Sequence, residues 1–410
     1  MSRVRSLLLA GVIAAVAYWL YTPVPDDIIS PWKFRSQYAV MRFTQDVVLP
    51  ILSIVNGQSY WVNLRQVIDS AAPDIPKTSG NIKITQTEFD GVKVLLYEPI
   101  KRGPHLSRGL IYIHGGGFVI GSTKLYHPLT LQLADELDMV VASIEYRLAP
   151  EHTFPAAHDD CVTVIKHFLR HLDEYGVDPA RVAVAGDSGG GRLTGALMHH
   201  FRDNEKSLPK IKIQGMIYPS LQALDVNNPS RQLYKKNWGN GGLLTGYDSA
   251  MFLSLYLNGK KDVDFIEAMI NDQLVPVEFR KNDVRYAKYL SHDLIPDSMR
   301  NKSFYTKPIF PDHVDETQWN RHKDALLDAR YAPLVQHDLK NLPQAYIMTC
   351  EHDTLRDDGV MYYKRLQQAG VETKWVNYQA GYHGMINPIG NYPVAKIAVK
   401  DFIDYLRKEL

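Results

Sequence analysis

A single serine, Ser188, lies in a run of small residues that suits nucleophilic catalysis. It is the third residue of the pentapeptide Gly-Asp-Ser-Gly-Gly at positions 186–190. The apolar residues 181–185 before it predict a strand, and residues 193–201 after it predict a helix. Glycines flank the serine because a sharp turn from strand to helix leaves no room for a Cβ. Such a turn would hold the hydroxyl at a helix N-terminus, where backbone N–H groups favour a developing negative charge.

The order of the supporting residues along the chain distinguishes between two classes of serine enzyme. Trypsin-like proteases carry the same pentapeptide, but their histidine and aspartate precede the serine. Here Asp353 follows a predicted buried strand at residues 344–350, and His383 follows another at residues 374–378. Serine, aspartate and histidine in this order are typical of α/β-hydrolases. We therefore predict Ser188 as the nucleophile, His383 as the base and Asp353 as the acid.

Neighbouring residues offer alternatives for the acid and the base. Asp353 is preferred because it lies nearest the end of the strand, whereas Asp357 and Asp358 are predicted in the first turn of the next helix. His352 is adjacent to Asp353 and so is poorly placed to bridge that carboxylate to the serine.

A second glycine-rich motif predicts the site of oxyanion stabilisation. Gly115, Gly116 and Gly117 follow His114 at the end of a predicted strand. Three glycines let the backbone turn its N–H groups toward one point, as in the His-Gly-Gly-Gly loop of esterases and lipases. No Lys-Ser/Thr follows, so the loop is not a P-loop, and its spacing misses the dinucleotide fingerprint by one residue. We expect these three glycines and Gly189 to form an oxyanion hole.

Together these motifs resemble the hormone-sensitive-lipase-like α/β-hydrolases, and within them the arylacetamide deacetylase and neutral cholesterol ester hydrolase family. The resemblance implies a hydrophobic ester or amide substrate, such as an arylacetamide, an acylglycerol or a cholesteryl ester, and an endoplasmic reticulum membrane protein. It weakens at residues 278–320. The matching segments are residues 112–117, 143–150, 186–188, 217–225, 349–359 and 381–384.

Two positions depart from the family pattern, which places alanine after the serine and asparagine three residues further on. The chain has Gly189 and Arg192 there. Gly189 can still donate its backbone N–H. Arg192 puts a positive charge in the first turn of a helix, where the dipole disfavours cations. We expect it to pair with Asp159 or Asp160, although altered substrate choice is the alternative.

The composition argues against several classes of partner. The chain has 410 residues, with 46 basic and 45 acidic side chains and a formal net charge of +1, so no nucleic acid partner is expected. The histidines show no zinc-ligand spacing with the two cysteines, Cys161 and Cys350, so we predict no metal and no cofactor. His199 and His200 are interpreted as an exposed helix pair. The cysteines either form a disulfide or stay buried as thiols.

The N-terminal segment predicts attachment to a membrane. Residues 6–25 carry no charge, and twenty helical residues would cover roughly 30 Å, about one hydrocarbon core. Arg3 and Arg5 precede this segment, so the positive-inside rule places residues 1–5 in the cytosol and the enzyme in the lumen, as a single-pass type II protein. The alternative is a cleaved signal peptide and a secreted soluble esterase. Asn301 begins the only permissible glycosylation sequon.

The rest of the chain predicts an α/β-hydrolase fold. Residues 26–80 are expected to form a helical cap or linker, with an amphipathic helical stretch at 31–57 that packs in the core, covers the site or lies on a membrane. Residues 81–410 would form the catalytic domain, because strands and helices alternate as in a mostly parallel sheet. Asp90-Gly91 predicts a hairpin at the sheet edge. Residues 221–331 lose the alternation and are predicted to be an inserted cap.

These features predict a membrane-anchored serine hydrolase that cleaves carboxylic esters through an acyl-enzyme. The alternative from another class is a catalytically inactive α/β-hydrolase that serves as a binding module; loss of a triad residue would indicate it, and none is lost here.

Overall fold

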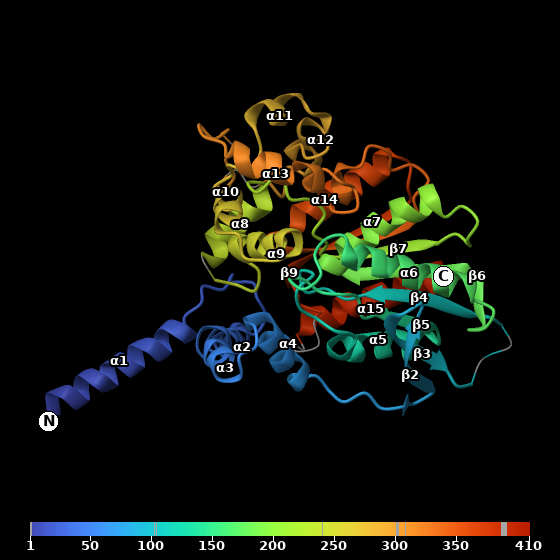
Figure 1. Ribbon diagram of the computed structural model, residues 1–410, viewed down its shortest axis with the longest axis horizontal. Helices are drawn as coiled ribbons and strands as arrows, with labels where there is room; N and C mark the ends of the chain where they lie inside the picture. Colours follow the sequence, from blue (N-terminus) through green and yellow to red (C-terminus); the bar gives the residue numbers. More distant parts are fainter. Residues whose placement is uncertain are drawn as a thin grey trace.

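One sheet organises the molecule (Figure 1). The computed structural model describes residues 2–101, 103, 105–239, 241–300, 303–307, 309–386 and 392–410. Within these residues the strands are β1 (Thr78–Ser79), β2 (Ile82–Phe89), β3 (Val92–Pro99), β4 (Ser107–Ile113), β5 (Val140–Ile144), β6 (Val177–Asp187), β7 (Ile213–Ile217), β8 (Gln344–His352) and β9 (Thr373–Tyr382). They form a nine-stranded sheet in the order β1-β2-β3-β5-β4-β6-β7-β8-β9.

The sheet is antiparallel at one edge and parallel elsewhere. β2 and β3 pair as a hairpin, and β3 runs antiparallel to β5. Asp90 and Gly91 at the hairpin turn both have positive φ, 49° and 88°, as a type I′ turn requires. From β5 to β9 all neighbours are parallel. The predicted mostly parallel α/β-hydrolase sheet and its edge hairpin are therefore confirmed.

Helices cover both faces of the sheet. α5 (Thr123–Leu137) and α15 (Pro393–Glu409) pack on one face, and α6 (Ala156–Arg170), α7 (Gly189–Asn204) and α14 (Arg356–Gln368) pack on the other. Central strands therefore bury side chains on both sides: along β4, Leu110 and Tyr112 join one core, and Ile111 and Ile113 join the other.

A helical cap is inserted between β7 and β8. Its helices are α8 (Pro229–Trp238), α9 (Gly246–Asn258), α10 (Val263–Ile270), α11 (Val277–Asn282), α12 (Val284–Ala287) and α13 (Glu316–Leu326). Figure 1 shows them grouped together at the top of the molecule. The insertion was predicted at residues 221–331 with the next strand of the sheet beginning at Gln344, and β8 begins at that residue.

The N-terminal region forms a separate helical lobe beside the cap. α1 (Ser2–Leu20) projects away from the molecule in Figure 1. After a linker come α2 (Pro31–Phe43), a π-helical turn (Thr44–Val48), α3 (Leu49–Asn56) and α4 (Tyr60–Ala71). By length and composition, one helical stretch among the described residues could cross a membrane, Pro31–Asn56; the apolar run Arg5–Ala17 within α1 is shorter.

The linker between α1 and α2 is docked on the fold. Arg35 Nε donates to the carbonyl oxygen of Thr22 at 3.1 Å, and His352 Nε2 lies 2.7 Å from Asp27 Oδ1. Ile28 is buried. The chain between α1 and α2 is therefore held against the catalytic domain at several points.

Candidate active site

Ser188 occupies a strained turn between β6 and α7. Its backbone has φ 54° and ψ −117°, which an L-residue adopts only where the surroundings impose it. A Cβ at Gly186 would come within 2.5 Å of the carbonyl oxygen of Ile113, and one at Gly190 within 2.1 Å of the same atom. Because β4 approaches this closely, only glycine fits at both positions. The turn has the geometry that the sequence predicted for a nucleophile elbow.

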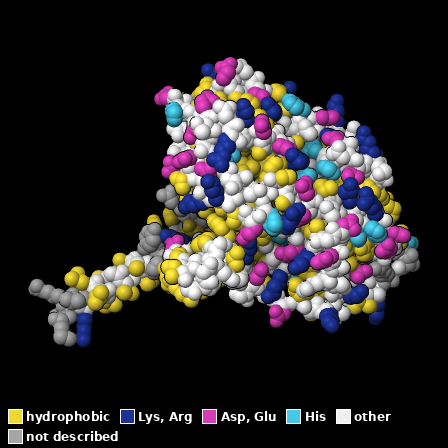
Figure 2. All heavy atoms as spheres, viewed as in Figure 1, with side chains coloured by type: hydrophobic (Ala, Val, Ile, Leu, Met, Phe, Trp, Pro, Cys, Tyr) yellow, Lys and Arg dark blue, Asp and Glu magenta, His cyan; other side chains and the backbone are white. Residues whose placement is uncertain are grey.

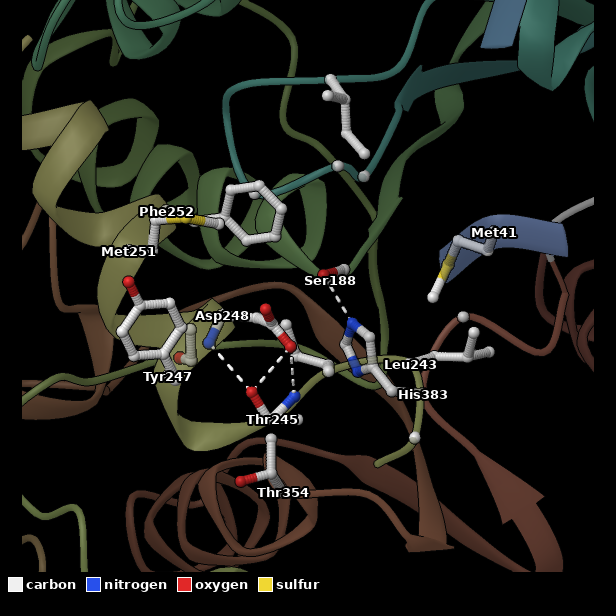
Figure 3. Close-up of a pocket in the computed structure, with 18 of the residues that line it drawn as sticks. Met41, Ser188, Leu243, Thr245, Tyr247, Asp248, Met251, Phe252, Thr354 and His383 are labelled. Carbon is white, nitrogen blue, oxygen red and sulfur yellow. Dashed lines mark hydrogen bonds between the residues drawn. The ribbon is translucent and has the colours of Figure 1, made fainter. Parts of the chain in front are cut away.

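The two other predicted triad residues lie beside Ser188. His383 Nε2 is 2.9 Å from Ser188 Oγ, and His383 Nδ1 is 2.8 Å from Asp353 Oδ2 (Figure 3). Asp353 directly follows β8 and is fully buried, and His383 directly follows β9. Parallel strands deliver their carboxyl ends to one sheet edge, which is why residues 165 and 195 positions from the serine meet it. Asp353 also accepts from the Leu355 amide at 2.8 Å, so its orientation is fixed.

The glycine loop after β4 lies next to the elbow. A Cβ built on Gly189 would be 3.4 Å from the Gly117 amide nitrogen, so these two backbones are in contact. Gly116 and Gly117 both have positive φ, 113° and 60°, which suits a loop that turns its N–H groups inward. Gly115 differs, because its amide donates to Asp187 Oδ1 at 2.9 Å. All four expected oxyanion residues line the cavity beside Ser188, but the Gly115 amide is engaged by Asp187, which leaves Gly116, Gly117 and Gly189 as the candidates.

Asp187 links the elbow to the glycine loop, a role that the sequence analysis missed. Its Oδ1 also accepts from the Tyr112 hydroxyl at 3.1 Å, and its Oδ2 accepts from the Tyr126 hydroxyl at 2.7 Å. Burial raises the pKa of Asp187, and these donors act in the opposite direction. The carboxylate therefore fixes Gly115 relative to Ser188. The sequence signal that could have revealed this role was the position of Asp187 directly before Ser188, in a run of otherwise small and apolar residues.

Asp357, Asp358 and His352, which the sequence analysis did not assign to the triad, have other partners. Asp357 Oδ2 accepts from the Ser230 amide at 2.6 Å, and Asp358 accepts from the Leu221 amide at 2.9 Å. Burial raises the pKa of Asp358 to about 6. The ring of His352 binds Asp27 instead of the serine. Asp357 and Asp358 lie in the first turn of α14, as expected.

The expected partners of Arg192 were wrong. Its guanidinium is 1% exposed and donates to the Ser220 carbonyl oxygen and hydroxyl, each at 2.6 Å, and to the Gln222 carbonyl oxygen at 3.1 Å. It also faces the Tyr331 ring at 4.8 Å. Asp160 binds Arg147, and Asp159 pairs with His158. Backbone carbonyls after β7 and an aromatic face therefore solvate the buried cation.

Arg192 still bears on the site through Ser220. The Ser220 amide donates to the Ser188 carbonyl oxygen at 3.3 Å. Arg192 thus holds in place the segment that packs behind Ser188.

Other expected residues also differ or lie outside the description. His199 is buried, and burial lowers its pKa to about 3, so the interpretation of an exposed histidine pair was wrong for this residue. His199 on α7 faces α14, where the Tyr362 hydroxyl lies 3.2 Å from its Nε2. Cys161 and Cys350 are free, buried thiols in the two opposite cores. Asn301 lies outside the described residues.

A large apolar cavity opens onto Ser188. Its volume is about 1710 Å³, above the usual range for small-molecule sites. The N-terminal lobe contributes Met41, and the cap contributes Leu243, Tyr247 and Phe252. In Figure 3, Met41 and Leu243 lie on one side of His383, and Tyr247 and Phe252 lie on the other. The cavity is therefore closed on both sides by segments outside the sheet.

Comparisons with known proteins agree with this architecture. The alpha/beta hydrolase fold family matches residues 110–277 and 292–387. Neutral cholesterol ester hydrolase 1 from Bos taurus is 38% identical over 389 residues, covering 93% of each chain. Arylacetamide deacetylase from Oryctolagus cuniculus is 35% identical over 410 residues, covering 98% of each chain. A solved arylesterase superposes with a TM-score of 0.60 at 22% identity, over 89% of this chain and 98% of that chain, which supports the fold.

The chain belongs to the alpha/beta hydrolase fold family, and its resemblance to the deacetylase and cholesterol ester hydrolase group is confirmed. The prediction that it is an enzyme of the carboxylic ester hydrolase class is confirmed as well.

Proposed function

We propose that this chain is a membrane-anchored serine hydrolase that cleaves esters of bulky apolar substrates by acyl transfer through Ser188. The observation that carries the proposal is the unbroken series from Ser188 Oγ to His383 to Asp353, with contacts of 2.9 and 2.8 Å. A nucleophile, a base and an orienting carboxylate in hydrogen-bond contact are what such catalysis requires.

In the first step, His383 Nε2 takes the proton of Ser188 while Oγ attacks the ester carbonyl carbon. The imidazolium is stabilised by Asp353, which accepts from Nδ1. The amides of Gly116, Gly117 and Gly189 donate to the oxyanion; loss of one such donor typically costs about 3 kcal/mol of transition-state stabilisation. The tetrahedral intermediate then collapses, and His383 gives its proton to the leaving alcohol.

In the second step, water replaces the alcohol. His383 takes a proton from the water as its oxygen attacks the acyl-serine, and the carboxylic acid leaves when the proton returns to Ser188 Oγ. No cofactor is needed for either step.

The cavity and the relatives support a bulky apolar substrate. A volume of about 1710 Å³ exceeds what a short-chain ester fills. The names of the two relatives point to cholesteryl esters and to arylacetamides. Both substrate groups are apolar, and we take the sterol or long-acyl ester as the first candidate because of the cavity size.

An activity screen tests the proposal. Purified wild-type protein is assayed with short and long acyl esters, aryl amides and sterol esters, with Ser188→Ala as the blank. A fluorophosphonate probe should label the wild type and leave Ser188→Ala unlabelled. Labelling of both proteins, or turnover by the blank, would refute Ser188 as nucleophile. An unlabelled wild type without turnover would support an inactive binding module.

We assign the anchor to α1 and the catalytic domain to the endoplasmic reticulum lumen. The 19 residues of α1 span roughly 28 Å, close to one hydrocarbon core. Arg3 and Arg5 at its start support a cytosolic N-terminus. Protease protection of the domain in sealed microsomes, and endoglycosidase-sensitive glycan at Asn301, are the expected results. Recovery of the mature protein without residues 1–21 in the medium would instead indicate a secreted esterase.

A further inference from the structure

The N-terminal lobe carries an apolar surface that faces solvent. We define the α2–α3 face as Trp32, Val40, Ile51, Ile54 and Val55. Trp32 is 73% exposed, Val40 67% and Ile54 83%, and Ile51 and Val55 are also exposed. Figure 2 shows hydrophobic side chains along α1 and on the adjoining lobe. An exposed apolar patch of this extent usually marks a binding surface.

The opposite side of the same helices explains why the stretch does not cross a membrane. Phe34 packs against Trp238 at 5.0 Å and against Tyr382 at 5.1 Å between ring centroids. Tyr38 and Leu49 are buried too, and the π-helical turn interrupts the helix between α2 and α3. Pro31–Asn56 is therefore long and apolar enough to span, but one side of it belongs to the fold. A helical segment of this kind lies along an interface.

The charge pattern of the lobe suits the surface of a lipid bilayer. Residues 47–55 carry no charge, while Lys33, Arg35 and Arg42 lie on α2. Long basic side chains beside an apolar face can place their charges in the headgroup layer while the face itself contacts the acyl chains. α1 contacts α2, and the docked linker keeps the two helices together, so the α2–α3 face continues the proposed anchor.

The cavity mouth adjoins this face. Val40 is exposed and also lines the Ser188 cavity. On the cap side of the mouth, Leu243, Tyr247 and Ile270 are likewise both exposed and cavity-lining. The rim thus carries apolar side chains on both sides, beside charged ones such as Asp46 and Lys261. An ester that left an acyl layer at Val40 would meet these apolar side chains on its way to Ser188.

We propose that the α2–α3 face inserts into the lipid interface and that esters dissolved in the bilayer enter the Ser188 cavity directly past Val40. The inserted face is a second membrane contact, distinct from the spanning helix α1. The entry route rests on the proposed function, whereas the insertion does not.

Site-specific labelling of the full chain in vesicles tests the insertion. Both native cysteines are fully buried, so Ile54→Cys would carry a single accessible thiol. A solvent-sensitive fluorophore at position 54 should be shifted to the blue and protected from iodide. Ile100→Cys, in the connection between β3 and β4 at the opposite end from α1, is the matched control and should be quenched freely. Equal quenching at both positions would overturn the insertion.

The same label distinguishes a lipid surface from a second copy of the chain. Protection by lipid is independent of the protein-to-lipid ratio. Protection that disappears on dilution into excess lipid, with energy transfer between labelled copies, would show that another copy covers the face and would overturn the proposal.

Charge substitutions test the entry route. Ile54→Glu/Val55→Glu should lower turnover of a long-chain ester embedded in vesicles by about tenfold, mainly through a raised KM, because the face leaves the lipid. Turnover of a dissolved short-chain ester should stay at the wild-type level, which reports an intact site. The matched control Ile100→Glu/Leu106→Glu should change neither activity. Unchanged turnover in vesicles would overturn the entry route.

The two proposals fail in different ways. If the wild type hydrolyses no ester at all, the proposed function is wrong, while the label at position 54 still reports on insertion.

Discussion

Two regions of the molecule meet at one cavity and differ in which side chains they bury: one buries polar groups, and the other exposes apolar groups. At the carboxyl ends of the strands, polar groups are buried: Asp353 and Asp187 lie in the interior and are satisfied by hydrogen bonds. In the N-terminal lobe, apolar groups such as Ile54 are exposed. Both arrangements cost stability in water. Hydrogen bonds offset this cost in the first region, and the lipid surface proposed above would offset it in the second.

The two regions also differ in how firmly their side chains are held. At the strand ends, Asp353, His383 and Asp187 are each held by partners at hydrogen-bond distance, so small chemical changes there should have large effects. The exposed face has few such constraints, and single substitutions on it should be tolerated by the fold. The following changes test the catalytic region, from the largest expected effect to the smallest.

Asp353→Asn should lower kcat by about 10⁴-fold, because an amide in this position favours the wrong tautomer of His383. The unfolding transition should remain cooperative and close to that of the wild type. Steady-state kinetics with a dissolved ester measures the effect. Asp357→Asn is the control, and it should reduce stability more than turnover, since Asp357 binds Ser230 and Arg356. The reverse pattern would show that the acid is assigned to the wrong residue.

Asp187→Asn should lower kcat by about 10²-fold, comparable to the loss of one oxyanion donor. The amide offers one acceptor oxygen where the carboxylate accepts from Gly115, Tyr112 and Tyr126, so the glycine loop should shift. Tyr126→Phe removes only one of these donors and should have a smaller effect on kcat. An unchanged kcat in Asp187→Asn would mean that the loop is held without this carboxylate.

Arg192→Met should lower the free energy of unfolding by about 3 kcal/mol, because the carbonyls of Ser220 and Gln222 lose their buried donor. Denaturant titration measures the change. Arg147→Met is matched in residue type, but Arg147 is half exposed in its ion pair with Asp160, and it should cost about 1 kcal/mol or less. Equal losses in the two variants would argue against a structural role for the buried cation.

His292→Gln should flatten the pH dependence of stability. Burial opposes protonation of His292, but the hydrogen bond to Asp225 at 2.8 Å outweighs it and raises the histidine pKa. Burial acts to raise the pKa of Asp225, and the histidine outweighs it and lowers that pKa. The ion pair therefore makes its full contribution to stability within one pH window. The upper limit of this window is the pKa of an unfolded histidine, about 6.5, and the lower limit is that of an unfolded aspartate, about 3.9.

This contribution is lost as the pH rises through the raised pKa of His292, and again as it falls through the lowered pKa of Asp225. Thermal unfolding between pH 6 and 8 should show a decline in the wild type that is shallower in His292→Gln. A parallel decline in both proteins would mean that other groups cause it.

The sequence predicted which side chains meet at Ser188 because the signals for them are local. Glycines at tight turns, and polar residues directly after apolar strands, can be recognised in a sequence without knowing which residues they contact. Gly115 was assigned only in part, since its amide partner, Asp187, comes from another strand. The partners of Arg192 were predicted wrongly because they are backbone carbonyls after β7. Every residue has such a carbonyl, so the sequence does not indicate which ones bind the cation.

The N-terminal lobe was less predictable for a related reason. An apolar stripe at 31–57 is equally consistent with core packing and with an exposed face. Phe34 and Tyr38 are buried, whereas Trp32 and Val40 are exposed. Which side of the helix is buried depends on where Trp238 and Tyr382 lie. His199 turns inward for the same kind of reason, since Tyr362 of a distant helix receives it.

The docked linker has a kinetic consequence. Contacts at Thr22, Asp27 and Ile28 leave little slack between α1 and the catalytic domain. If α1 anchors the chain as proposed, the docked linker should keep the enzyme close to the surface of the vesicle that it occupies, and it should not exchange between vesicles. In a mixed population, product would then appear in a burst limited to occupied vesicles, and substrate in the empty ones would persist.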